Sequence, residues 1–183
     1  MRMKTAVLKK KGRGLFAALA LLTTFMVFLA ACGSSAPAGS GGPAGSNPPA
    51  QPFTLDVAAL GERLHTELEY RDQLEELEPE IVYTMLGIDA ADVASQKNYI
   101  SSGATAEEII IFQAVDREAA VRLKEALAAR CQDQQDVYAS YAPEEVGYLQ
   151  QAVLMDKETY VVFCVPVDGQ AAEKLIKEAL ELK

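Results

Sequence analysis

A segment near the start of the chain limits how much of the sequence can fold. Residues 33–52 read GSSAPAGSGGPAGSNPPAQP and contain neither a charge nor a large apolar side chain. Such a segment cannot bury enough surface to offset the entropy that its ordering would cost. We therefore expect residues 32–52 to be a disordered linker with a reach of roughly 25 Å. The rest, residues 53–183, has the length and composition of a single globular domain.

Two segments before the linker are typical of an exported protein. Residues 1–13 contain six Lys and Arg side chains, and residues 14–31 are uncharged and largely apolar. An apolar run of this length is either a long signal-peptide core or a short membrane span. Both interpretations place the rest of the chain outside the cytoplasm.

The end of the apolar run favours the signal peptide. Leu29-Ala30-Ala31-Cys32 resembles the lipobox of bacterial lipoproteins, in which small residues precede a cysteine. The resemblance implies cleavage between Ala31 and Cys32, so that residues 1–31 are a lipoprotein signal peptide. It also implies two acyl chains on Cys32, and two chains are enough for stable anchoring. The protein would then be held at the cell membrane, facing outside the cytoplasm.

Removal of the signal peptide would turn a mildly acidic chain into a strongly acidic one. The whole chain has a formal charge of −9, from 17 basic and 26 acidic residues. No acidic residue precedes Asp56, so residues 32–183 keep 26 acidic but only 11 basic residues, a net charge of −15. This charge excludes sequence-general nucleic-acid binding, which needs a basic surface. It also disfavours adhesion to anionic headgroups, so membrane contact would come through the lipid on Cys32.

Helical spacing dominates the first part of the expected domain. Apolar residues recur at near-helical intervals over residues 54–77, with Thr54 or Asp56 as the N-cap. Pro79 ends this N-terminal helix and can open a second helix over residues 80–86. Gly87 suits the C-cap of the second helix.

Two pairs of strands follow, each with a helix after it. The strands are expected at residues 97–102, 109–112, 150–155 and 159–165. The second pair is predicted as a hairpin around Asp156-Lys157-Glu158. The helices are expected over about residues 117–132 or longer, with Asp116 as N-cap, and from Asp168 onward.

This order of elements predicts the α+β class. We expect a two-layer sandwich, in which a small antiparallel sheet of about four strands carries helices on one face and is preceded by the N-terminal helix.

The domain also resembles a family catalogued as domain of unknown function 4358. The similarity lies in Leu86-Gly87-Ile88-Asp89, in Tyr99 to Ala104, in Ala106-Glu107-Glu108-Ile109 with Phe112 and Asp116, in Arg130, in Gln134 or Gln135, and in Tyr141-Ala142-Pro143-Glu144. It covers roughly residues 54–183. The chain departs from the family at Asp156-Lys157-Glu158, where a glycine is usual. The resemblance implies a lipoprotein or secreted protein of Gram-positive, largely clostridial bacteria, and it brings no activity and no catalytic residue.

Two cysteines would remain after Cys32 is acylated. Outside the cytoplasm, Cys131 and Cys164 leave a disulfide open. We expect Cys131 on the inner face of a helix and Cys164 in an apolar strand. In such places a free cysteine behaves as a small hydrophobe, and this is the preferred interpretation.

The other reactive side chains do not form a catalytic motif. His65 is the only histidine, and no local motif supplies partners for a metal site or an acid–base pair. Glu107-Glu108 and Glu144-Glu145 are adjacent carboxylates, which we interpret as helix-start or loop residues, with a capping box from Thr105 to Glu108. The sequence therefore predicts no catalytic residue, no metal ligand and no cofactor.

Tyr138, Tyr141 and Tyr148 are expected in and near a loop before the hairpin. Exposed loop tyrosines can mark a recognition surface, or they can cover the open end of a core. We expect a non-catalytic domain that binds a protein partner at the membrane surface. The alternatives are a small-ligand sensor or capture module and, third, an envelope enzyme. Partner binding predicts an exposed apolar or tyrosine-rich patch, whereas ligand capture predicts an enclosed cavity.

Overall fold

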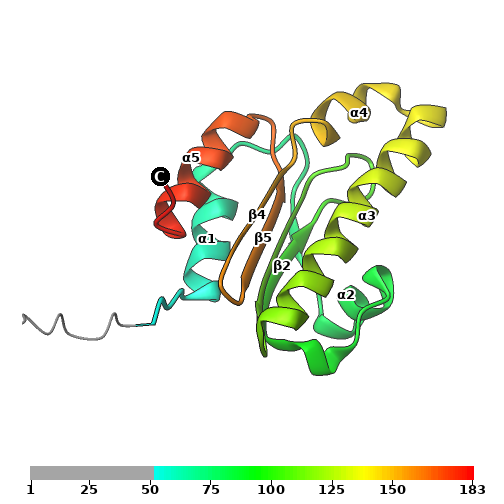
Figure 1. Cartoon of the computed structure of the whole chain (residues 1–183). Helices are drawn as coiled ribbons and strands as arrows, with labels where there is room; N and C mark the ends of the chain where they lie inside the picture. The colour runs from blue at the N-terminus through cyan, green and yellow to red at the C-terminus, as the bar shows by residue number, and fades with distance from the viewer. Residues whose placement is uncertain (1–51) are drawn as a thin grey trace, which may run out of the picture. The chain divides into compact units, whose positions relative to one another are not determined.

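The computed structural model describes residues 52–183 (Figure 1). The predicted signal peptide, Cys32 and nearly all of the predicted linker lie outside the described residues. The predictions of cleavage, acylation and linker disorder therefore stay predictions.

The α+β class and the antiparallel sheet are confirmed. The elements in chain order are α1 (Val57–Glu67), β1 (Glu75–Glu76), α2 (Pro79–Leu86), a short 3-10 helix (Ala90–Asp92), β2 (Val93–Ile100), β3 (Glu108–Ala114), α3 (Arg117–Tyr141), α4 (Pro143–Leu149), β4 (Val153–Lys157), β5 (Tyr160–Val165) and α5 (Gly169–Ala179). The five strands form one open sheet in the order β1-β2-β3-β5-β4, and every neighbouring pair is antiparallel.

Helices cover both faces of the sheet, whereas we expected them on one face. Figure 1 shows α1 and α5 on one side and α2, α3 and α4 on the other. The physical reason lies in β3 and β5, which are buried at nearly every position. Because side chains alternate across a strand, such strands need cover on both faces. Alternate residues supply two separate cores: Ile109, Ile111, Val162 and Cys164 face one layer, and Ile110, Phe112, Val161 and Phe163 face the other.

The first helix is shorter than the spacing predicts. Asp56 caps it by accepting from the Ala59 N–H (2.9 Å), but it ends at Glu67 instead of near residue 77. The following residues are extended and include β1. Leu74 packs on the α1 side of the sheet and Leu77 on the α2 side. The segment thus carries the chain from one layer to the other, which a continuous helix on one face would not do.

Other local predictions are confirmed. Pro79 is the first residue of α2, and Gly87 follows it in the left-handed region (φ 63°). Asp116 accepts from the Ala119 N–H (2.7 Å) at the start of α3. Asp168 accepts from two backbone N–H groups at the start of α5.

Several boundaries differ from the prediction, among them the start of β2, the end of α3 and the turn after β4. The helix α3 continues to Tyr141, so Tyr138 and Tyr141 lie on its last turns and not in a loop. The turn between β4 and β5 consists of Glu158 and Thr159, since Lys157 pairs with Tyr160. Glu158 adopts φ 54°, a conformation that favours glycine. The local sequence supplies no glycine there.

Candidate functional site

The two edges of the sheet are built differently. At one edge, β1 has only two residues, both exposed glutamates, and its neighbour β2 has an irregular register between Val93 and Ser95. Short length, charge and irregularity all discourage pairing with another strand. At the other edge, β4 has five residues in unbroken register with β5 and contains no proline. β4 does carry two charged side chains, Asp156 and Lys157, but its length and its regular register leave it less protected than the edge at β1.

The pairing of β5 fixes which way its backbone groups face. The Ala114 N–H donates to the Thr159 carbonyl (2.8 Å), beside the pair formed by Gln113 and Tyr160. Bonds that lie beside a pair mark it as the non-hydrogen-bonded kind in an antiparallel ladder. The N–H and C=O of Tyr160 therefore face β4.

The same alternation fixes the backbone of β4. Tyr160 pairs with Lys157, so Lys157 and, two residues away, Met155 direct their backbone groups toward β5. Leu154 and Asp156 must then direct their N–H and C=O groups out of the sheet. These four groups form a repeating pattern of donors and acceptors along the open edge.

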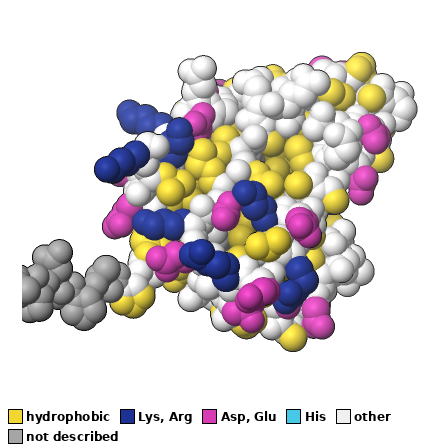
Figure 2. All heavy atoms as spheres, in the orientation of Figure 1, with side chains coloured by type: hydrophobic (Ala, Val, Ile, Leu, Met, Phe, Trp, Pro, Cys, Tyr) yellow, Lys and Arg dark blue, Asp and Glu magenta, His cyan; other side chains and the backbone are white. Residues whose placement is uncertain are grey.

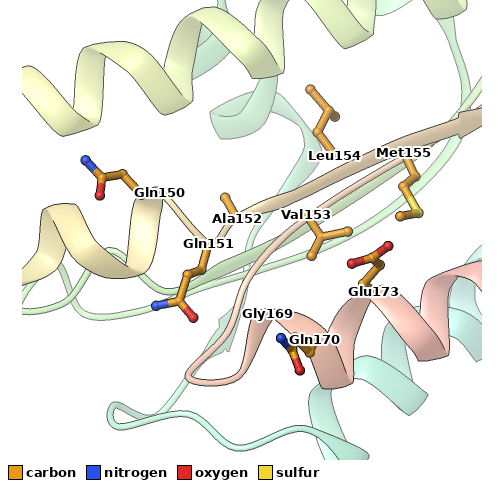
Figure 3. Close-up of a pocket in the computed structure, with 9 residues that line it drawn as sticks. All are labelled: Gln150, Gln151, Ala152, Val153, Leu154, Met155, Gly169, Gln170 and Glu173. Carbon is orange, nitrogen blue, oxygen red and sulfur yellow. The ribbon is translucent and has the colours of Figure 1, made fainter.

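A hollow lies on the α5 side of this edge (Figure 3). Its volume is about 410 Å³, and it is lined by Gln150, Gln151, Ala152, Val153, Leu154, Met155, Gly169, Gln170 and Glu173. Figure 3 shows Met155 and Leu154 pointing to opposite sides of β4. A Cβ at Gly169 would lie 2.5 Å from the carbonyl oxygen of Gln151, so only glycine lets α5 begin this close to the turn before β4.

A second hollow lies on the α3 side of the same edge. Its volume is about 520 Å³, and its lining includes Val121 and Lys124 of α3 together with Asp156 of β4. Val121 is an apolar side chain that is 53% exposed, and Lys124 pairs with Asp156 at 2.5 Å. Figure 2 shows hydrophobic atoms gathered on this face of the molecule, between α5 and α3. We call β4 and its two hollows the β4 edge.

Charged groups are concentrated at one end of the sheet, where three chain segments meet. Glu107 is fully buried, and its carboxylate accepts from the backbone N–H groups of Arg71 (2.8 Å) and Asp72 (2.9 Å) and from the Thr105 hydroxyl (2.9 Å). The Arg71 Nε also donates to it (3.2 Å). The segment between α1 and β1 is thereby joined to the loop before β3.

The same arginine binds a second buried carboxylate. The two terminal nitrogens of Arg71 donate to the two oxygens of Glu145, at 2.7 and 2.6 Å, and Glu145 also accepts from the Ala106 N–H (2.9 Å). The hydrogen bonds from Arg71 lower the pKa of Glu145, and those to both glutamates raise the pKa of Arg71. The centroid of the Tyr148 ring lies 3.7 Å from the guanidinium carbon of Arg71, so the ring covers one face of the guanidinium group. We call Arg71, Glu107 and Glu145 the Arg71 cluster.

Glu108 has its own partner. The Arg130 Nη2 donates to it at 2.7 Å, and Gln134, with its amide oriented to satisfy both neighbours, donates to Glu108 (3.2 Å) and accepts from Arg130 (3.0 Å). Burial raises the pKa of Glu108, although Arg130 opposes the shift. Glu108 lies in β3, so the predicted capping box from Thr105 is wrong, because no helix starts there.

The glutamates act as structural ties. Glu145 does lie in the first turn of α4, as predicted, but its carboxylate reaches across to Arg71 and Ala106. The carboxylates of Glu107, Glu108 and Glu145 are all paired, and none of these side chains is more than 3% exposed. Paired, enclosed carboxylates are poor candidates for proton transfer to a substrate. Sequence reasoning missed these ties because their partners lie 22 to 74 residues away.

The three tyrosines do not form one exposed surface. Tyr138 is buried, and its hydroxyl donates to the Thr105 carbonyl (2.7 Å). Tyr148 is half-buried against Arg71, and Tyr141 is 61% exposed. Recognition through these residues stays a prediction, with Tyr141 as the most accessible of the three.

The cysteines of the described residues are free. Cys164 is buried in the core beneath α1 and α5, whereas Cys131 packs against the core on the opposite face of the sheet. The disulfide that the sequence left open is therefore not formed, because the sheet separates the two thiols. Burial raises the pKa of Cys164 to about 12.

Among the described residues, His65 does not belong to a metal-binding cluster. His65 is half-buried and stacks on the Tyr99 ring with centroids 4.3 Å apart. Within residues 52–183, no three His, Cys, Asp or Glu side chains gather in a way that could hold a metal ion. No helix in this part of the chain has the length and hydropathy of a membrane span.

Comparison with known proteins identifies the family. No curated protein and no solved structure matches the chain. The family model described as Domain of unknown function (DUF4358) matches residues 67–166, which is more than half of the chain. The match includes all five strands and the Arg71 cluster, and it stops before α5. The chain therefore belongs to the DUF4358 family.

Proposed function

We propose that this protein is a lipid-anchored lipoprotein that binds a protein partner at the outer side of the cell membrane. The observation that carries the binding part is the β4 edge, where an open strand lies between two hollows. A sheet edge with free backbone groups, bordered by two open hollows of mixed apolar and polar lining, is a surface that another protein can use for association. The closed carboxylate pairs support a role that does not involve catalysis.

The anchoring part rests on the sequence. The lipobox-like Leu29-Ala30-Ala31-Cys32 ends an apolar run, and a neutral linker separates it from the domain. The net charge of −15 on residues 32–183 gives the domain no electrostatic attraction to anionic lipid, so a covalent lipid is the simplest means of attachment.

A small-ligand module is the second candidate. It is favoured by the hollow on the α5 side, which has the volume of a small-molecule site and carries three glutamine side chains. Both hollows of the β4 edge are open to solvent, whereas most small-ligand sites enclose their ligand. The openness of both hollows therefore favours partner binding over ligand capture.

Mass spectrometry of the membrane fraction tests the anchor. We expect an N-terminal peptide that starts at a diacylglyceryl Cys32. A Cys32→Ser chain is the control and should stay uncleaved. Recovery of unmodified Cys32 with residues 1–31 still attached would contradict the lipoprotein proposal.

Crosslinking in intact cells tests partner binding. The full chain carries a photo-crosslinking amino acid at several exposed positions, one per variant, and adducts are identified by mass spectrometry. We expect one envelope protein to be crosslinked repeatedly from neighbouring positions. If no position gives a protein adduct and a small molecule instead shifts the thermal unfolding of the full chain, the ligand-binding candidate replaces this one.

A further inference from the structure

The β4 edge also indicates how the partner binds, an inference that rests on the proposed function. We propose that an extended segment of the partner adds to β4 as a sixth strand of the sheet. Strand addition needs an edge with outward donors and acceptors, and Leu154 and Asp156 supply two of each. The opposite edge, at β1, offers two exposed glutamates and discourages the same mode of binding.

The two hollows lie where the side chains of an added strand would go. Strands in a sheet are about 4.8 Å apart, and successive side chains point to opposite faces. A segment beside β4 would send alternate side chains toward the hollow on the α5 side and the hollow on the α3 side. The helices α5 and α3 would then flank the added strand, one on each face of the sheet.

The side chains that line the two hollows limit which partner sequences can bind there. Val121 on α3 and Met155 on β4 offer apolar contacts, one in each hollow, but the hollow on the α3 side is otherwise lined mainly by charged side chains of both signs. The α5 side adds glutamine amides and one carboxylate, Glu173. The acidic domain repels acidic segments. We therefore expect an uncharged or basic segment of at least five residues, without proline at the positions that pair with Leu154 and Asp156.

Two substitutions at Asp156 distinguish strand addition from other modes of binding. Asp156 is exposed, and its outward N–H does not contribute to pairing with β5. Asp156→Pro removes that donor and blocks a neighbouring strand, whereas Asp156→Ala keeps the N–H and loses only the ion pair with Lys124. Peptides are selected from a random 12-residue display library on the full chain in detergent. We expect the selected peptides to bind Asp156→Ala as they bind the wild type, and Asp156→Pro about tenfold or more weakly.

A second measurement avoids any effect of proline on folding. Each backbone amide of the best peptide is methylated in turn, and binding to the wild-type chain is measured. Strand addition predicts losses at every second residue, because only alternate amides face β4. Equal binding of all methylated peptides, unchanged binding to Asp156→Pro, or a library without binders would overturn the inference.

Crosslinking in cells distinguishes the failure of this inference from the failure of the proposed function. We expect adducts from position 156 and none from Ile81 or Val137, two exposed apolar residues away from the β4 edge. Partner adducts from Ile81 or Val137 alone would keep partner binding and reject strand addition. A wild-type dimer in sedimentation that Asp156→Pro abolishes would assign the edge to a second copy and also reject it.

Discussion

A single substitution at Arg71 removes ion pairs to two buried carboxylates, those of Glu107 and Glu145. Arg71→Met keeps the apolar stem but leaves Glu145, which is 3% exposed, without its two strongest hydrogen bonds. Glu107 loses one contact and keeps its bonds to two backbone N–H groups and to Thr105. Removal of one partner of a buried ion pair costs about 3–5 kcal/mol. Because Arg71 is itself 29% exposed, we expect the lower end, about 3 kcal/mol in the free energy of unfolding.

Urea unfolding of the full chain, followed by circular dichroism, measures this loss. Arg122→Met is the matched control, because Arg122 also binds a carboxylate through two nitrogens, at Asp92, but is 54% exposed. We expect that control to lose no more than about 1 kcal/mol. Equal losses in the two variants would refute the argument that burial of the carboxylates sets the cost.

The pH dependence supplies a sign test of the same argument. Arg71 lowers the pKa of Glu145 below its usual value in the folded state. The resulting stability is present above the usual glutamate pKa and is lost as the pH falls through the lowered pKa. In Arg71→Met the lowering is gone, so the difference in stability between wild type and variant should shrink on acidification. A difference that grows at low pH would contradict it.

Three further predictions concern local geometry, and thermal or chemical unfolding checks the first two. Glu158→Gly should stabilise the protein by about 0.5–1 kcal/mol, because φ 54° is strained for glutamate; no gain would contradict this. Gly169→Ala should destabilise it by about 1–3 kcal/mol, whereas Gly147→Ala, with nothing near its new Cβ, should stabilise α4 by up to about 1 kcal/mol. Cys164 should resist thiol labelling at pH 8 until the domain unfolds, and then both Cys131 and Cys164 should react without a reductant. Rapid labelling of the folded chain at Cys164 would contradict its burial.

Local chemistry was the part of the fold that could be predicted from the sequence. The caps at Asp116 and Asp168 and the helix start at Pro79 depend on neighbours within a few residues, and all three are confirmed. The strands β3 and β5 are also predictable, because runs of β-branched and aromatic residues favour strands.

The errors came from features that local spacing does not encode. The leucines at 68, 74 and 77 keep near-helical intervals, but their side chains pack from an extended segment onto two different cores. The continuous apolar runs at residues 109–112 in β3 and 160–165 in β5 already imply two covered faces. Both errors concern which layer a segment joins, and that depends on contacts distant in sequence.

The candidate site was the least predictable part. No motif marks β4 as an edge strand, since strand order depends on pairing between distant segments, such as β3 and β5, whose paired residues are 47 to 57 positions apart. The Arg71 cluster was missed for the same reason, although the unusual run Ala106-Glu107-Glu108-Ile109 at a strand start was a usable signal. Acidic residues at the start of a buried strand need partners of opposite charge, and the arginines of the chain are the candidates.

Amide hydrogen exchange at the β4 edge tests the central claim most directly. In the free full chain, the N–H groups of Leu154 and Asp156 should exchange much faster than that of Met155, which bonds to β5. A selected peptide should slow exchange at Leu154 and Asp156 and leave Met155 unchanged. If Leu154 and Asp156 are already protected in the free chain, or stay unprotected when the peptide is bound, the account of the β4 edge as a strand-binding site is wrong.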